Sequence, residues 1–142
     1  MTADNLQFID SNIVVYAYDA SNPDKHQSAG KLVGGLWKSR QGCLSIQVLQ
    51  EFYVTVTKKV SQPLPLHQAA QIVADLGAWN CHSPTPADLQ IAMDIQQRYT
   101  ISFWDALIIT SAKKLKCSTL WSEDINPGQY YEDIEVKNPF WR

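Results

Sequence analysis

Short apolar segments alternate along the chain with longer stretches in which apolar residues recur every three or four positions. The short segments have the length of buried strands, and the longer ones have the pattern of amphipathic helices. Alternating strands and helices form βαβ units, in which parallel strands build a sheet and helices cover both of its faces. The sequence therefore predicts an α/β fold of three layers with a central, mainly parallel sheet.

Capping residues mark where several of the predicted helices begin, namely Ser45, Thr85 and Ser102. The helix after Ser45 is predicted although residues 53–57 are β-branched and alternate like a strand, because the helical spacing of apolar residues upstream continues to Val56. The predicted strands are 8–10, 43–45, 79–82, 117–122 and 134–136. The predicted helices are 25–40, 46–59, 66–76, 85–99 and 102–116.

The segment LQFIDSNIVVYAYD, residues 6–19, looks like a core strand that is interrupted by Asp10, Ser11 and Asn12. A buried carboxylate without a partner costs several kcal/mol or is forced into its neutral form. The fold must therefore provide Asp10 with a cation, a set of hydrogen-bond donors or solvent.

Charge and cysteine content limit the classes of function. With 14 acidic and 12 basic residues the net charge is -2, so no global basic field marks a nucleic-acid-binding protein, although a local basic strip stays compatible. The three cysteines show neither CxxC nor metal-ligand spacing and fit reduced thiols. The sequence shows no secretory leader and no apolar run of about 18 residues. We therefore expect one domain, residues 1–142, in the cytoplasm and away from membranes.

Four acidic residues are expected at one edge of the sheet. Asp10 and Asp124 follow the first and fourth predicted strands, and such folds place their chemistry beyond the C-terminal ends of their strands. Glu51 lies in the second turn of one helix and Asp105 in the first turn of another, and both helices begin at that edge. Four carboxylates repel one another unless cations, water or donors balance them, and oxygen ligands without histidine or cysteine favour Mg²⁺ or Mn²⁺.

Each of these acids also has a plain structural interpretation. Asp10 can form an Asx-turn with Asn12, and Glu51 can be a solvated helix residue. Asp105 can complete a capping box, and Asp124 can be an ordinary loop acid. No single residue distinguishes a structural from a catalytic role, so the prediction of a catalytic site depends on the four acids together.

Four segments in order resemble the PIN-domain family, and within it the toxin component of VapBC-type toxin–antitoxin pairs. The segments are FIDSNIVVYAYD, VLQEFYVTVTKK, SFWDALIITSAKKL and LWSEDINPGQ. The resemblance extends from about residue 7 to residue 138, and the last two segments are the most specific. Matched position by position, the family's acidic set falls on Asp10, Glu51, Asp105 and Asp124.

Polar or acidic residues directly flank the first and the fourth of these acids. Ser11 or Asn12 would be the polar companion of the first acid, and Ser11 stands where many relatives have threonine, which keeps the hydroxyl. Glu123 precedes Asp124 directly, so the fourth acid is ambiguous by one position.

The resemblance implies a metal-dependent endoribonuclease of α/β/α architecture, usually dimeric, whose groove is blocked by the C-terminal segment of a small antitoxin protein. Asp10, Asp105 and Asp124 would hold one Mg²⁺ or Mn²⁺. Glu51 would complete a second metal site or orient the attacking water. One or two metal ions then polarise the scissile phosphate of the RNA substrate and lower the pKa of bound water.

Three other classes of protein compete with this interpretation. A haloacid-dehalogenase-type phosphatase needs a second aspartate two positions after the first, where this chain has Asn12. A response-regulator receiver needs an acidic pair and a phosphoacceptor on the third strand, and neither is evident. A catalytically silent PIN-like module that binds RNA or protein is the remaining alternative, and the four mutually repelling acids argue against it.

Lysines end both the helix that carries Glu51 and the helix that carries Asp105. They complement the helix dipoles or contact phosphates, and the first interpretation explains most such clusters. Trp104 either stacks on a base or is a partly buried core or dimer-contact aromatic. Trp141 is expected to dock on the domain. The lysines are Lys58, Lys59, Lys113, Lys114 and Lys116.

Overall fold

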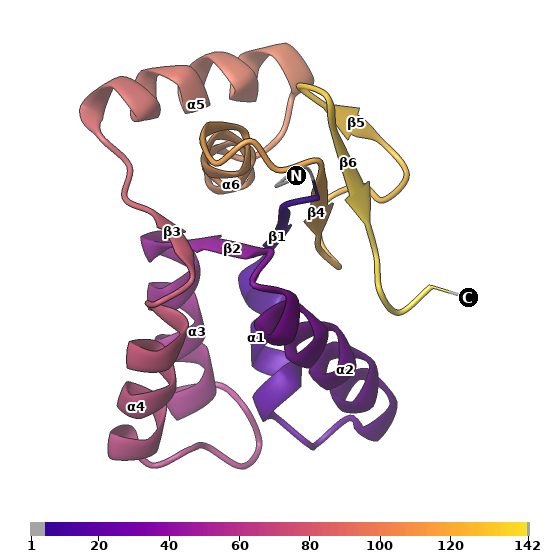
Figure 1. The fold of residues 1–142 in the computed structure, drawn as a ribbon. Coiled ribbons are helices and arrows are strands. Elements are labelled where there is room, and N and C mark those ends of the chain that lie inside the picture. The colour runs from indigo at the N-terminus through magenta and orange to yellow at the C-terminus, as the bar shows by residue number, and fades with distance from the viewer. Residues whose placement is uncertain (1–4, 142) are drawn as a thin grey trace.

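The computed structural model describes residues 5–141, which form six strands and six helices (Figure 1). The strands are β1 (Gln7–Ile9), β2 (Gly42–Ser45), β3 (Asn80–His82), β4 (Thr119–Trp121), β5 (Tyr130–Tyr131) and β6 (Ile134–Lys137). The helices are α1 (Ser11–Tyr18), α2 (Pro23–Ser39), α3 (Ile46–Lys58), α4 (Leu66–Leu76), α5 (Pro86–Tyr99) and α6 (Phe103–Lys114).

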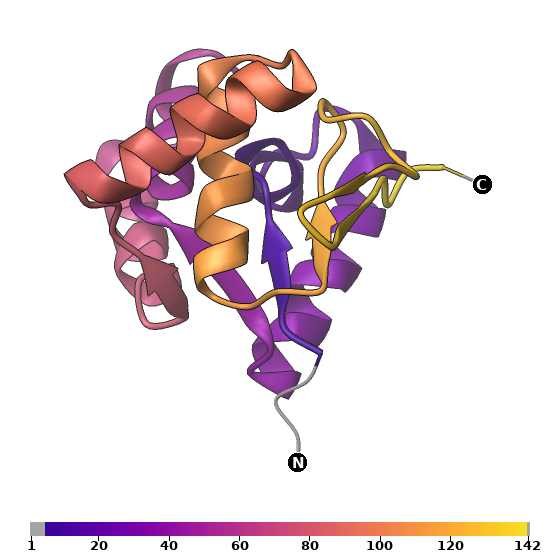
Figure 2. The same cartoon turned by 90° about the horizontal axis from the view of Figure 1, so that it is seen from above.

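The strands form one sheet in the order β3-β2-β1-β4-β6-β5. Every neighbouring pair is parallel except β5 and β6. Helices α1 to α4 lie on one side of the sheet, and α5 and α6 lie on the other (Figure 1). Viewed from above, α5 crosses over α6, which runs alongside the sheet (Figure 2). The prediction of a three-layer α/β/α fold with a mainly parallel sheet is confirmed.

The central strands are buried on both faces. Phe8 and Ile9 are neighbours on β1 and therefore point to opposite faces, yet both are fully buried. Leu44 of β2 and Leu120 of β4 are fully buried as well. Apolar runs of this kind are what a parallel sheet between two helical layers requires.

The segment after Asp10, for which no helix or strand was predicted, forms helix α1 and does not continue the strand of residues 8–10. Asp10 is the N-cap of α1, and its carboxylate accepts a hydrogen bond from the Ser11 N–H at 2.7 Å. The consecutive apolar residues 13–15 are all buried because α1 packs against both α2 and α3. This burial outweighs the strand preference of β-branched residues.

The predicted helix starts are confirmed by their caps. Ser45 Oγ accepts from the Val48 N–H at 3.3 Å, and Thr85 forms a reciprocal capping box with Asp88. The helix assigned to the β-branched segment 53–57 is also confirmed, as the C-terminal part of α3. The two-residue strand β5 was not predicted. It pairs with β6 through a tight turn whose residues 132 and 133 have positive φ without being glycine, so the usual hairpin cue is missing.

Two smaller expectations concern cysteines and membranes. All three cysteines are free thiols, and Cys43 and Cys117 are buried in the core, as expected for small filling side chains. Within residues 5–141, none of the helices combines the length and the hydropathy that a membrane crossing needs.

Candidate active site

Asp10 leaves β1 at the C-terminal edge of the sheet and is 5% exposed. Besides the Ser11 N–H, its carboxylate accepts hydrogen bonds from Ser122 Oγ at 2.8 Å and from Asn12 Nδ2 at 3.3 Å. The fold therefore provides the set of donors that the sequence required for this buried carboxylate.

Ser122 is a site residue that sequence reasoning missed. In the sheet, Ile9 pairs with Trp121, and the Asp10 N–H donates to the Trp121 carbonyl at 2.9 Å. Asp10 and Ser122 are the residues that follow this pair, so the pairing places them side by side at the ends of β1 and β4. Only the register of β1 against β4 reveals this partnership, because a serine at the end of a predicted strand carries no cue of its own.

Asn12 joins the first and fourth acids. Its Nδ2 group donates to Asp10 Oδ2 at 3.3 Å and to Asp124 Oδ2 at 3.1 Å. Its Oδ1 accepts from the Glu123 N–H at 3.2 Å. The expected polar companion of Asp10 is therefore Asn12 as well as Ser11, and it also orients the exposed carboxylate of Asp124.

Glu51 faces the same edge from the second turn of α3. Its Oε1 accepts from Ser11 Oγ at 2.9 Å, and its Oε2 accepts from Gln47 Nε2 at 3.3 Å. Ser11 thus links α1 to α3 through the carboxylate, and the solvated-helix interpretation of Glu51 does not describe this environment.

Asp105 lies in the first turn of α6, where its N–H donates to Ser102 Oγ at 3.0 Å. Burial raises the pKa of its half-buried carboxyl, and the charges of Asp124 and Glu51 raise it further, against the effect of Ser102. Asp105 therefore shares one electrostatic environment with two acids that come from distant segments.

The pKa of Asp10 rises to about 6, chiefly because burial removes solvent from its carboxylate. The hydrogen bonds from Ser122 and Ser11 act in the opposite direction, and the charges of Glu51 and Asp105 add to the rise. Shifted carboxyl pKa values next to like charges are typical of functional sites.

Three helix N-termini point to the acidic edge and offset part of its negative charge. Helices α1, α3 and α6 all begin there, capped by Asp10, Ser45 and Ser102. The N-terminal end of a helix carries partial positive charge and stabilises nearby anions. The backbone thereby supplies some of the compensation that four gathered carboxylates need.

The donor set fits a hard divalent cation by its chemistry. Carboxylate oxygens with amide and hydroxyl neighbours are the ligands that Mg²⁺ and Mn²⁺ prefer. Among residues 5–141, no three side chains of His, Cys, Asp or Glu already stand in an arrangement that holds a metal ion. The acids share an edge and a network of hydrogen bonds, but they do not form a closed ligand set in this conformation.

Glu123 is directed away from the acids by its own partners. Its carboxylate accepts from the Tyr16 hydroxyl at 3.1 Å and forms an ion pair with Lys25. Lys25 also lies over the rings of Tyr16 and Phe140. The neighbouring Asp124 has the amide of Asn12 as its partner, which favours Asp124 as the fourth member of the acidic set.

A groove of about 620 Å³ opens beside the acids, and Ser11, Asn12, Asp124 and Lys59 are among its lining residues. Lys59, which follows α3, thus brings a positive charge to the groove beside the acids.

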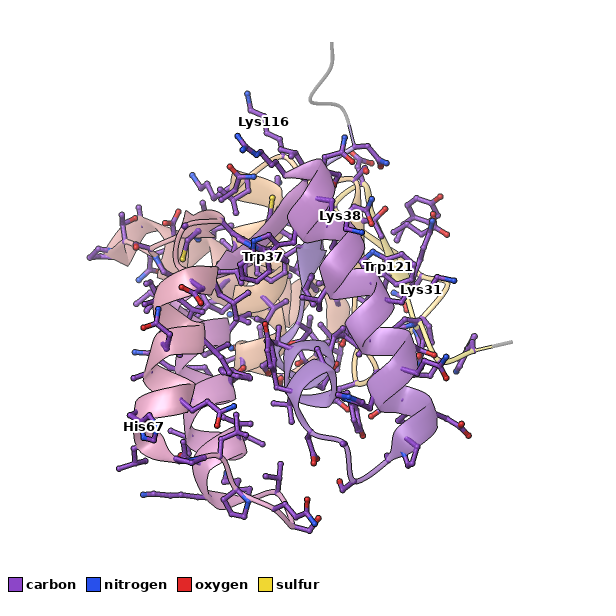
Figure 3. The ribbon with its side chains drawn as sticks, turned by 60° about the horizontal axis from the view of Figure 1, so that its bottom comes forward. Lys31, Trp37, Lys38, His67, Lys116 and Trp121 are labelled. Carbon is purple, nitrogen blue, oxygen red and sulfur yellow. The ribbon has the colours of Figure 1, made fainter. Side chains whose placement is uncertain are left out.

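The lysines at the end of α6 have other positions. Lys113 pairs with Glu132 at 2.9 Å, and Lys114 pairs with Asp88 at 3.5 Å. Lys116 lies at the same end of the molecule as Lys38 of α2 (Figure 3). Asp105 is at the opposite end of α6, so these lysines lie away from the acidic edge, and Lys113 and Lys114 form ion pairs within the domain.

Two tryptophans differ from the structural expectation. Trp104 is 61% exposed beside Asp105, so it is not a core residue, while base stacking and a dimer contact both stay compatible with this position. Trp141 is 67% exposed, and the neighbouring Phe140 docks instead, with its ring edge-on to Tyr16 at 5.3 Å. The expectation that Trp141 docks on the domain was therefore wrong.

The three histidines lie in ordinary structural or surface positions. His82 is nearly buried and contacts Ser111 Oγ and Asp88 Oδ2, while His26 contacts the Tyr16 carbonyl. His67 is exposed on α4 (Figure 3).

Comparison with known families identifies the fold. The model of the PIN domain matches residues 8–132, which include all four acids and their partners. The chain belongs to the PIN-domain family. The resemblance seen in the sequence motifs is thereby confirmed. None of the curated proteins matches the chain by sequence.

Solved structures of toxin–antitoxin proteins share this PIN fold. A toxin–antitoxin complex from Klebsiella pneumoniae has a TM-score of 0.66 at 16% identity, covering 94% of this chain and 97% of that one. VapC20 from Mycobacterium tuberculosis gives 0.62 at 19%, over 80% and 86%. VapBC2 from Rickettsia felis, bound to a DNA fragment from its promoter, gives 0.66 at 19%, over 96% and 99%.

Proposed function

We propose that this PIN domain is a metal-dependent endoribonuclease that acts as the toxin of a toxin–antitoxin pair. The observation that carries the proposal is the network at the C-terminal edge of the sheet. Asn12 binds Asp10 and Asp124 together, and Ser11 holds Glu51 on the same side. Evolved cores rarely gather acids without a cation or substrate to balance them, because each buried charge costs stability.

In this proposal, metal binding, orientation of the carboxylates and RNA contact belong to different residues. Asp10, Asp105 and Asp124 hold a Mg²⁺ or Mn²⁺ ion, and Glu51 completes a second site or orients the attacking water. When bound, the ion polarises the scissile phosphate and lowers the pKa of water, so that no protein nucleophile is needed. Ser11, Asn12 and Ser122 keep the carboxylates oriented, and Lys59 contacts the RNA backbone in the groove.

The solved relatives support the biological part of the proposal. VapC20 is described as a toxin that cleaves the sarcin–ricin loop, and the other two structures are toxin–antitoxin assemblies. By analogy, we propose that residues 1–142 act as one domain in the cytoplasm, form a homodimer and bind an antitoxin protein over the acidic groove. The cleavage activity of VapC20 supports an RNA substrate for this chain.

A catalytically silent PIN module that binds RNA or protein is the second candidate. It is favoured by one observation, which is that the acids do not form a ligand set in the present conformation. The hydrogen bonds that join Asp10 to Asp124 through Asn12 support the nuclease, because they hold two acids from distant segments close together where a cation can balance them.

The decisive experiment is cleavage of a mixed RNA pool by the antitoxin-free protein with Mg²⁺, with Mn²⁺ and with a chelator. We expect cleavage that requires the metal and disappears in folded Asp10→Asn and Asp105→Asn variants. Asp75→Asn is the matched control, because Asp75 is an exposed acid on α4 and lines a different cavity. A folded protein that cleaves no pool and is not stabilised by either metal would favour the silent module.

A further inference from the structure

Gln47 is a buried amide beside the acids that the proposed chemistry does not yet use. It lies one helical turn before Glu51 on α3 and is 7% exposed. Its Nε2 donates to Glu51 Oε2 at 3.3 Å and to the backbone carbonyl of Trp104 at 3.2 Å.

These two hydrogen bonds connect two elements of the site. An amide NH₂ has two hydrogens, and in Gln47 both are used. One fixes a carboxylate oxygen of α3, and the other fixes the backbone of α6 next to Asp105. Ser11 Oγ donates to the other oxygen of Glu51, so both carboxylate oxygens accept a hydrogen bond.

The amide oxygen of Gln47 reduces the stability that this residue contributes. Among the described residues, Oε1 is buried without a hydrogen-bond partner. An unpaired buried acceptor costs about 1–3 kcal/mol, which offsets much of what the two hydrogen bonds of Nε2 contribute. A methionine of similar size would fill the same space without that cost, so the amide needs another reason.

We propose that Gln47 is a positioning residue that holds Glu51 and the first turn of α6 at the spacing needed for metal binding. The proposal rests on the nuclease function proposed above. The donor to Glu51 acts as an outer partner of the ligand set, and such partners orient carboxylates that bind metals. Gln47 itself contacts neither metal nor substrate.

The test compares Gln47→Met with wild type and with Gln50→Met, a matched control at an exposed position of the same helix. Mn²⁺ affinity is measured by electron paramagnetic resonance on the full chain, and thermal unfolding is measured with a chelator. We expect Gln47→Met to bind Mn²⁺ about 10- to 100-fold more weakly, as is usual when an outer partner is removed. Its melting temperature should match that of wild type, and Gln50→Met should change neither quantity.

Three outcomes would overturn the proposal. Unchanged Mn²⁺ affinity in Gln47→Met shows that the amide positions nothing. A lower melting temperature with unchanged affinity of the folded fraction shows a purely structural role. If Gln47→Met does not fold, the shorter amide of Gln47→Asn decides, because it cannot span both acceptors and must also weaken Mn²⁺ binding. A wild type that binds no Mn²⁺ rejects the proposed function itself and is thereby distinguished from the first two outcomes.

Discussion

Ser122 Oγ donates a hydrogen bond to Asp10 Oδ2 at 2.8 Å, across 112 positions of sequence. The same hydroxyl accepts from the N–H groups of Asp124 and Ile125 at 3.1 and 3.2 Å. One buried hydroxyl therefore orients the first acid and shapes the loop that carries the fourth. The ends of β1 and β4 become one unit through this contact.

Replacing Ser122 with alanine should weaken both parts of this unit. The variant Ser122→Ala leaves Asp10 with fewer donors and two loop N–H groups without their acceptor. We expect a loss of about 1–3 kcal/mol in the free energy of unfolding, measured with urea at pH 7. Ser118→Ala, at an exposed serine on the loop before β4, is the control and should stay within about 0.5 kcal/mol of wild type. Equal stabilities of the two variants would contradict the assigned role.

Asp10 should destabilise the metal-free protein at neutral pH. Its pKa is about 6 in the folded protein and 3.8 ordinarily, so the folded state binds more protons between these values. The free energy of unfolding therefore falls as pH rises from about 4 to about 6, by up to about 3 kcal/mol from this group. With a chelator, Asp10→Asn should be more stable than wild type at pH 7.5 and equal to it near pH 3.5.

Urea titrations of both proteins at the two pH values measure this effect. Addition of Mn²⁺ is the internal control, because an ion that binds only the folded state should stabilise wild type and leave Asp10→Asn unchanged. An Asp10→Asn variant that is less stable than wild type at pH 7.5 without metal would show that the carboxylate is not strained by burial.

Much of this site follows from local sequence, and the remainder depends on register. The acids after β1 and β4 and the helix caps at Ser45 and Ser102 are predictable, because strand ends and N-caps leave local patterns. Ser122 and Gln47 carry no such pattern. Their roles arise from the pairing of Ile9 with Trp121 and from the approach of α6 to α3, which are tertiary relationships.

The first helix shows the opposite case, in which a local pattern was present but ambiguous. Residues 13–15 are all apolar and β-branched, which favours a strand by propensity. Asp10 is also a good N-cap, and that feature decides the structure once α1 can bury its side chains between α2 and α3. Propensity is a weak guide where burial on all sides is available.

Glu132 should protect the protein against acid. Lys113 is the main cause that lowers its pKa to about 2, with Arg98 and the Tyr99 hydroxyl contributing. A lowered carboxyl pKa gives stability that is present above about pH 4.5 and is lost as pH falls through 2. Glu132→Gln should lower the free energy of unfolding by about 2 kcal/mol at pH 7, after allowance for screening of its exposed partners, and the difference should vanish near pH 2.

Denaturation between pH 2 and pH 7 measures the effect of Glu132. Asp133→Asn is the matched control, because Asp133 occupies the same turn with an exposed side chain and a positive φ that asparagine tolerates. A Glu132→Gln penalty that is independent of pH would indicate lost packing rather than lost charge.

Trp104 should contribute to RNA binding without contributing to stability. Its ring is 61% exposed beside Asp105, and stacking of a base on an exposed aromatic is worth about 1–3 kcal/mol. Trp104→Ala should weaken the binding of single-stranded RNA about tenfold in the presence of a chelator, as measured by fluorescence anisotropy. Trp104→Phe, which keeps a stacking surface, should retain most of the affinity. Equal affinities of the alanine and phenylalanine variants would exclude stacking.

The fourth acid can be assigned by separating Asp124 from Glu123. Asp124 shares Asn12 with Asp10, whereas Glu123 forms an ion pair with Lys25 and accepts a hydrogen bond from Tyr16. Asp124→Asn should keep the stability of wild type. Its rate of RNA cleavage should fall more than the roughly 10- to 100-fold that is typical when a residue behind a metal ligand is replaced. Glu123→Gln should cleave RNA at nearly the rate of wild type and lose about 0.5–1 kcal/mol of stability, since its ion pair is partly exposed.

Lys25→Met should reproduce that loss, and the double variant should add little to it, because both changes break the same pair. Loss of cleavage in Glu123→Gln with full activity in Asp124→Asn would move the fourth position of the site by one residue.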